Sequence, residues 1–219
     1  MINLNLIFPE IFISLSIMFL LLVGVFKSKS SNFVYNLSII SLLISLALIL
    51  NYPIDTNISL FNNSYKIDYL SSFMKILTLV SGIFVMFVSS KYIQITKIFK
   101  IEYPILTLSS ILGMMVMISS NDLIVFYIGL ELQSLALYVL ASFNRDNLLS
   151  SESGVKYFVL SALSSGLLLY GCSLMYGFSN STNFVLIAEN INSSSYGLTF
   201  GIVFILVGLA FKISAVPFH

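Results

Sequence analysis

The feature that most constrains the fold of this chain is a series of long apolar stretches separated by short polar junctions. A helix that crosses a bilayer core needs roughly 20 apolar residues, and each stretch approaches that length. The stretches are continuous and do not alternate, which favours helices over the strands of a β-barrel. The sequence therefore predicts an all-α polytopic membrane protein with about seven transmembrane helices. The stretches cover residues 6–26, 33–50, 69–90, 104–119, 123–142, 155–176 and 198–217.

The composition agrees with a membrane protein. Charged residues make up only 9% of the 219 residues, whereas soluble domains have about 25%. The formal net charge of +1 gives no reason to expect a nucleic-acid partner. The single cysteine, Cys172, excludes a disulfide or a CxxC motif within the chain. Membrane lipids are the surroundings that this composition predicts.

The basic residues of the junctions predict an orientation. Taking alternate junctions, one side of the membrane has six basic residues and the other has only Lys66. The positive-inside rule places the basic side in the matrix or cytoplasm and the N-terminus on the outer side. Residues with AT-rich codons are abundant and tryptophan is absent, which favours the mitochondrial inner membrane, with the bacterial inner membrane as the alternative. The six basic residues are Lys27, Lys29, Lys91, Lys97, Lys100 and Arg145.

Two outer junctions are expected to contain some structure. Residues 57–68 show a weak strand-like alternation of apolar side chains. Residues 183–191 are predicted to form a short interfacial helix with Phe184, Leu186 and Ile187 facing the membrane.

Four ionisable side chains fall within the predicted spans, and such groups are functional by default because a charge in lipid is costly. Glu131 lies near the middle of its helix and is interpreted as the partner of a lysine; the alternative is a neutral glutamate hydrogen-bonded between helices. Lys156 lies about one turn inside its helix and could instead extend to the interface. Lys75, near an outer helix end, is expected to extend to the interface in this way. The fourth residue is Lys212.

Lys212 is the strongest candidate, because an apolar run surrounds it and Pro217 follows shortly after it. A proline in a helix frees a carbonyl and kinks or breaks the helix, so a break is predicted near residues 214–217. Charge beside a broken helix at mid-membrane is how transporters build ion sites. The alternative is an ion pair that only holds the broken helix together. Lysine suits proton transfer because its pKa responds to burial and neighbouring charge, whereas arginine stays protonated.

No other chemistry is evident in the sequence. No pair of residues has metal-ligand spacing, no glycine-rich phosphate loop occurs, and no nucleophile has an adjacent base. We therefore expect no metal and no cofactor, and interpret Glu131, Lys156 and Lys212 as the proton path.

Three blocks of sequence resemble the NADH–ubiquinone oxidoreductase chain 2 family, which is subunit N of the bacterial enzyme and one of the antiporter-like subunits of respiratory complex I. The blocks are ELQSLALYV from Glu131, GVKYFVLSALSSGLLLYG from Gly154 and GLAFKISAVPFH from Gly208. The resemblance covers the whole chain. It implies a fold of about fourteen helices, in which two inverted repeats of about five follow three leading helices. Residues 1–101 would be the leading helices, and residues 102–219 an incomplete first repeat ending in the first half of helix 7.

The resemblance also implies a function. The family's helix 5 glutamate matches Glu131, its helix 6 lysine matches Lys156, and the lysine of its broken helix 7 matches Lys212. These residues belong to a proton path in the membrane arm, driven by electron transfer from NADH to quinone elsewhere in the complex. The subunit itself performs no redox chemistry and binds no redox cofactor. Its expected partners are the other membrane-arm subunits.

The chain departs from the family pattern after His219, where family members continue through helix 8 and a second repeat. We expect either a second chain that completes helix 7 and the C-terminal repeat, or a partial record. Two other functions stay open: a subunit of a multisubunit cation/proton antiporter, and a structural spacer that does not pump.

Overall fold

The computed structural model describes residues 4–26, 31–51, 57–95, 100–190 and 196–216. Five of its helices are long and apolar enough to cross a membrane. They are α1 (Phe8–Phe26), α2 (Ser31–Leu50), α3 (Tyr69–Ile95), α5 (Leu123–Ala141) and α6 (Leu148–Ser179). Two shorter apolar helices have 17 residues each, α4 (Glu102–Ile118) and α8 (Tyr196–Lys212). The seven predicted apolar helices are therefore confirmed, and the protein is a multi-pass, all-α membrane protein.

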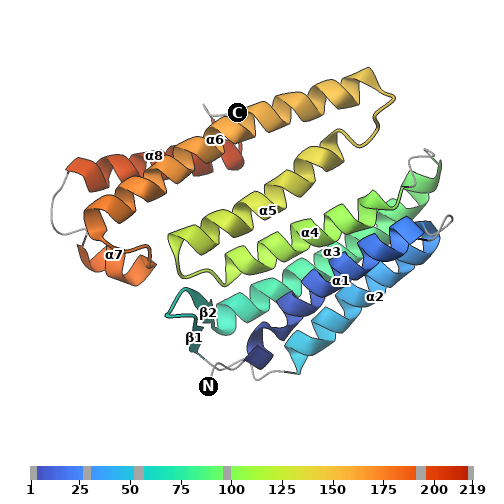
Figure 1. Cartoon of the computed structure of the whole chain (residues 1–219), viewed down its shortest axis with the longest axis horizontal. Helices are drawn as coiled ribbons and strands as arrows, with labels where there is room; N and C mark the ends of the chain where they lie inside the picture. Colours follow the sequence, from blue (N-terminus) through green and yellow to red (C-terminus); the bar gives the residue numbers. More distant parts are fainter. Residues whose placement is uncertain (1–3, 27–30, 52–56, 96–99, 191–195, 217–219) are drawn as a thin grey trace.

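The apolar helices run side by side along the long direction of the molecule (Figure 1). The short helix α7 (Phe184–Asn190) and the strands β1 (Ile58–Leu60) and β2 (Tyr65–Ile67) lie at one end, where α1 also begins (Figure 1). A 3-10 turn, η1 (Leu4–Ile7), precedes α1. This end corresponds to the side that the sequence predicts to be the outer one.

Both structured junctions at this end are confirmed. β1 and β2 form an antiparallel hairpin in which Ile58 pairs with Ile67. The turn between them uses residues with positive φ at positions 61–63. The interfacial helix also forms, but the expectation that Ile187 faces the membrane is wrong. Ile187 is buried against the α5–α6–α8 part of the fold, while Leu186 is exposed.

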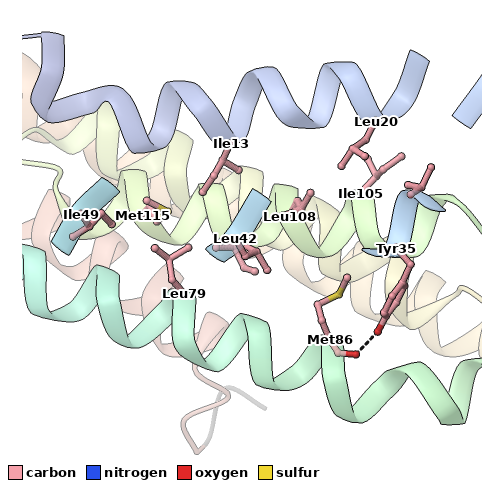
Figure 2. Close-up of a cluster of buried hydrophobic side chains, with 12 residues drawn as sticks. Ile13, Leu20, Tyr35, Leu42, Ile49, Leu79, Met86, Ile105, Leu108 and Met115 are labelled. Atoms are coloured by element: carbon pink, nitrogen blue, oxygen red, sulfur yellow. Dashed lines mark hydrogen bonds between the residues drawn. The ribbon is translucent and has the colours of Figure 1, made fainter. Parts of the chain in front are cut away.

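The larger hydrophobic core joins α1, α2, α3 and α4 (Figure 2). Tyr35 of α2 donates a hydrogen bond to the Met86 carbonyl of α3 within this core (Figure 2). A second core joins α5, α6, α7 and α8. Helix α4 packs closely against α5 and so connects the two cores.

Small residues set the two closest helix contacts. A Cβ added at Gly113 of α4 would meet the Gln133 backbone nitrogen of α5 at 2.6 Å. A Cβ added at Gly171 of α6 would meet the Ile205 nitrogen of α8 at 2.8 Å. Glycine at these positions lets the backbones approach, as is common between membrane helices. The second contact holds α8 against α6 and thereby fixes the position of its last residue, Lys212.

Candidate functional site

Helix α8 ends at Lys212, and the backbone beyond it shows how the helix ends. The Ala215 N–H donates to the Ala210 carbonyl at 2.9 Å, and the Ser214 N–H donates to the Phe211 carbonyl at 3.2 Å. Ser214 has a φ of 52°. This pair of bonds around a left-handed residue is the Schellman motif. Helix α8 therefore ends where the break is predicted, with Ser214 in the left-handed conformation; Pro217 and His219 lie outside the described residues.

The ammonium group of Lys212 lies at the centre of the site. Its Nζ is 3.1 Å from Glu131 Oε1 on α5. It also donates to Ser134 Oγ at 3.2 Å and to the Tyr138 hydroxyl at 2.9 Å. Residues 131, 134 and 138 are spaced by three and four, so one face of α5 presents all three groups to the end of α8.

A third helix completes the surroundings of Glu131. Ser165 of α6 donates a hydrogen bond to Glu131 Oε1 at 2.5 Å. The centroid of the Tyr138 ring lies 5.6 Å from Lys212 Nζ. The same ring packs edge-on against the ring of Tyr157, with the two centroids 4.8 Å apart. The carboxylate thus accepts bonds from Ser165 and Lys212, and aromatic side chains of α5 and α6 border the ammonium.

The pair is partly shielded from its surroundings. The Lys212 side chain is 11% exposed and the Glu131 side chain 20%. Desolvation of this degree makes a charge costly unless it has a partner, so each charge stabilises the other. Hydroxyls from Ser134, Ser165 and Tyr138 supply groups that can both donate and accept. This arrangement can hold a proton on Lys212 Nζ, with the oxygens of these hydroxyls within hydrogen-bonding reach.

Lys156 does not join this pair. It forms an ion pair with Glu152 on its own helix at 2.6 Å, and its side chain is 70% exposed. Ser165, the α6 residue that reaches Glu131, is nine residues further along, or about 13 Å. The expectation that Glu131 partners a lysine is met by Lys212, whereas the part of Lys156 in a proton path stays a prediction.

Lys75 also differs from expectation, because it is buried and does not extend to the interface. Its Nζ lies 2.6 Å from Glu10 Oε1 of α1, and their side chains are 5% and 6% exposed. The Tyr65 hydroxyl of the hairpin contacts both residues. The expectation failed because the first turn of α1 supplies an acidic partner, Glu10, whose contact with α3 depends on how the two helices pack.

Sequence reasoning missed two members of the Lys212 site. Ser165 lies in an apolar helix with small polar residues on one side, and Tyr138 lies two turns after Glu131. Polar residues spaced by three or four from an intramembrane glutamate were the available signal for Ser134 and Tyr138. No local signal identified Ser165, because its contact depends on how α6 packs against α5.

Within the part of the chain that the structure describes, no group of three or more His, Cys, Asp or Glu side chains could hold a metal ion.

Fold and site together resemble membrane proteins of the antiporter-like class: a multi-pass helical bundle in which the end of one helix presents a lysine to a glutamate of its neighbour. Residues 120–219 match the family model described as the membrane region of NADH:quinone oxidoreductase and Mrp antiporters. More particularly, the chain is similar to the amino-terminal part of NADH-quinone oxidoreductase subunit N.

Two bacterial relatives illustrate the similarity. The subunit N of Pelagibacter ubique is 76% identical over 217 residues, which cover 99% of this chain and 46% of the relative. The subunit N of Bartonella bacilliformis is 52% identical over 220 residues, which cover 99% of this chain and 45% of the relative. The chain thus spans about half the length of the curated relatives it matches.

Solved structures share the fold. A chain of Thermus thermophilus respiratory complex I superposes with a TM-score of 0.78 at 24% identity, covering 96% of this chain and 45% of that one. A chain of an archaeal membrane-bound sulfane sulfur reductase gives 0.83 at 20% identity, covering 99% and 45%. A chain of the Mrp complex from Dietzia gives 0.71 at 18% identity, covering 99% and 42%. At these identities the similarity establishes the fold alone.

Proposed function

We propose that this chain forms the amino-terminal part of a proton-translocating antiporter-like subunit in the membrane arm of a respiratory NADH–quinone oxidoreductase. One observation carries the proposal: the lysine that ends broken helix α8 is paired with the intramembrane Glu131 at 3.1 Å. Placing charged groups within a membrane bundle costs free energy. Such groups are commonly found in proton relays.

The proton that moves is held on Lys212 Nζ. In the paired state the ammonium donates to Glu131, Ser134 and Tyr138. When Glu131 withdraws, the ammonium loses its counter-charge, and its N–H bond breaks as the proton passes to a water molecule, either directly or through the Tyr138 hydroxyl, which releases its own proton to that water as it accepts. The return of a proton to the amine and of Glu131 to the ammonium completes the cycle. Ser165 positions Glu131 and does not carry the proton itself.

Lys156 has a separate role in this proposal. It lies in the part of α6 that precedes the site by about three turns, on the side predicted to face the cytoplasm. With its side chain 70% exposed, it is accessible to water or to a neighbouring subunit. We place it where protons enter the path from that side.

The proposal assigns the electron transfer to other parts of the complex. NADH oxidation and quinone reduction would occur elsewhere, and this chain would bind neither a redox cofactor nor quinone. Its partners would be the other membrane-arm subunits and membrane lipids. Residues 1–101 and 102–219 would correspond to the leading helices and the first repeat.

The relatives favour the bacterial inner membrane, because the similar subunit N proteins described above are bacterial. The mitochondrial location expected from codon usage has no support among them. The basic junctions support an orientation with the N-terminus on the periplasmic side. Two of these basic residues, Lys100 and Arg145, line a common pocket, so they lie at the same end of the bundle.

A cation/proton antiporter subunit is the second candidate, because the Mrp complex shares the fold and the matching family model includes Mrp antiporters. NADH-oxidising, quinone-reducing activity that copurifies with the chain distinguishes the first candidate from the second. A structural spacer without pumping is the third candidate, and the paired Glu131 and Lys212 argue against it.

The test uses the assembled complex that contains this chain. Lys212→Ala should abolish most of the NADH-driven proton translocation by this subunit. Electron transfer from NADH to quinone should continue. Lys66→Ala is the matched control, since Lys66 is 49% exposed in the hairpin, outside the spans. Normal pumping by Lys212→Ala in fully assembled complex would contradict the proposal and favour the spacer.

A further inference from the structure

A second buried cluster of ionisable groups lies outside the Lys212 site. Glu10 of α1, Lys75 of α3 and Tyr65 of β2 meet in a triangle of hydrogen bonds. Lys75 Nζ is 2.6 Å from Glu10 Oε1, and Tyr65 donates to the same oxygen at 2.8 Å. Lys75 also donates to the Tyr65 hydroxyl at 2.9 Å. None of these residues contacts Glu131 or Lys212 in the described bonds.

The cluster is buried and lies beneath the hairpin. The side chains of Lys75 and Glu10 are 5% and 6% exposed. Strand β2 turns Tyr65 and Ile67 inward and Lys66 outward. Apolar side chains, including Ile7 and Leu60, pack around Tyr65. Lys75 is about two turns into α3, roughly 9 Å from its first residue, so the cluster lies close to the outer end of the bundle.

Two polar atoms beside this triangle have no hydrogen-bond partner among the described residues. They are Glu10 Oε2 and Ser119 Oγ, both buried. Ser119 follows α4 and lies next to the hairpin, since its carbonyl accepts from the Lys66 N–H at 2.8 Å. A buried polar atom without a partner is costly, and an ordered water commonly satisfies such groups. Oε2 can only accept while the carboxylate is charged, whereas the Ser119 hydroxyl can donate or accept, so an ordered water can satisfy either atom.

The Tyr65 hydroxyl stays protonated throughout. Burial raises its pKa well above the ordinary value of 10.0, and the charge of Glu10 raises it further. Tyr65 is therefore a fixed donor to Glu10 Oε1. The free oxygen, Oε2, is then the position at which the carboxylate can accept a proton.

We propose that Glu10, Lys75 and Tyr65, with Ser119, form a second proton-binding site, which holds one water molecule and takes up a proton on Glu10 Oε2. In the charged pair the site has no net charge. A proton that arrives from within the bundle converts the carboxylate to the acid. Lys75 stays an ammonium, and the site then has one positive charge. Release of that proton to the outer side restores the pair. No oxidant, reductant or leaving group is involved.

The role of this site in transport rests on the proposed function. The binding of a proton at Glu10 can be tested without it. In the proposed function, the site would lie at the outer end of the bundle, where translocated protons leave. The proton-binding step can be measured without pumping, because a buried carboxylic acid has its own infrared carbonyl band.

The experiment records infrared difference spectra of the purified complex across a pH titration. Glu10→Gln should lose a titrating carboxylic-acid band that Glu131→Gln retains. Tyr65→Phe should keep the band but move it to higher frequency, because the acid carbonyl loses its hydrogen-bond donor. A band that persists unchanged in Glu10→Gln, or in an assembled Tyr65→Phe complex, would overturn the second site.

The Tyr65→Phe variant keeps the test decisive if Glu10→Gln fails to assemble. Failure of the proposed function shows separately, as normal pumping in Lys212→Ala. A titrating Glu10 band together with normal pumping in Lys212→Ala would uphold the second site and contradict the proposed role of the first.

Discussion

Lys212 and Glu131 are 81 residues apart in the sequence, yet Lys212 Nζ donates to Glu131 Oε1 at 3.1 Å. The contact requires three packing events. Helix α8 must end at Lys212, it must lie against α6, and α5 must turn its Glu131–Tyr138 face toward both. Each event can be tested separately from the chemistry.

Removing the carboxylate should impair pumping without removing the lysine. Glu131→Gln keeps the size of the side chain and a hydrogen-bond acceptor for Lys212, but it removes the charge that stabilises the ammonium. We expect proton translocation to fall to a small fraction of normal, measured per NADH oxidised in reconstituted vesicles. Ser165→Ala is the control: it removes one bond to Glu131 and should reduce pumping less. Equal losses in the two variants would contradict the central role of the Glu131 charge.

The buried pair of Glu10 and Lys75 should contribute strongly to stability. Breaking a buried ion pair leaves an uncompensated charge and costs roughly 3–5 kcal/mol. Glu10→Gln and Lys75→Met should therefore each lower the thermal unfolding temperature of the complex markedly. The double variant should be less destabilised than the sum of the two singles, since no charge then remains without its partner. Additive losses would show that the two residues act independently.

The end of α8 depends on an unusual backbone conformation at Ser214. Residues with a Cβ occupy the left-handed region at a cost of about 1–2 kcal/mol, and glycine does not. Ser214, with its φ of 52°, should therefore tolerate glycine. We expect Ser214→Gly to stabilise the helix end by about 1 kcal/mol or less, with pumping retained. Ser214→Val should lower both stability and pumping. A destabilised Ser214→Gly would indicate that the break has another cause.

Asp68 gives a pH-dependent prediction outside the membrane. The Ser71 backbone N–H, which donates to Asp68 Oδ1 at 2.8 Å, lowers the pKa of Asp68 below 3.8, with a smaller contribution from Lys66. A lowered pKa adds stability that is present above the unfolded value and lost as pH falls through the folded value. Asp68→Ala should cost about 1 kcal/mol at neutral pH through loss of the helix cap. Unfolding measured against pH should show this difference shrink below about pH 4. A constant difference would exclude the titration of Asp68 as its source.

The sequence predicted the helices well, because a bilayer requires long apolar stretches that are visible without any knowledge of packing. It also predicted the break after Lys212 and the short hairpin. It failed where the answer depended on which helices meet. Lys75 and Lys156 both lie near helix ends, but α1 brings Glu10 to Lys75, whereas among the described residues Lys156 pairs with Glu152 of its own helix.

The same reason explains the parts of the site that sequence reasoning did not find. Ser134 and Tyr138 share a helix face with Glu131, so the helical period indicates them. Ser165 and Tyr65 reach their carboxylates from other elements, 34 and 55 residues away in the chain. Contacts at such separations depend on the tertiary arrangement, which a single sequence does not show.

The most direct test of the central claim is proton translocation by Lys212→Arg in fully assembled complex. Arginine keeps a positive charge beside Glu131, so assembly and the ion pair should survive, but it does not release its proton at ordinary pH. The account predicts that NADH oxidation continues while the number of protons moved per electron falls, as is also expected for Lys212→Ala. Normal proton translocation by Lys212→Arg would show that Lys212 serves only to hold α8 against Glu131, and would contradict its role as the proton carrier.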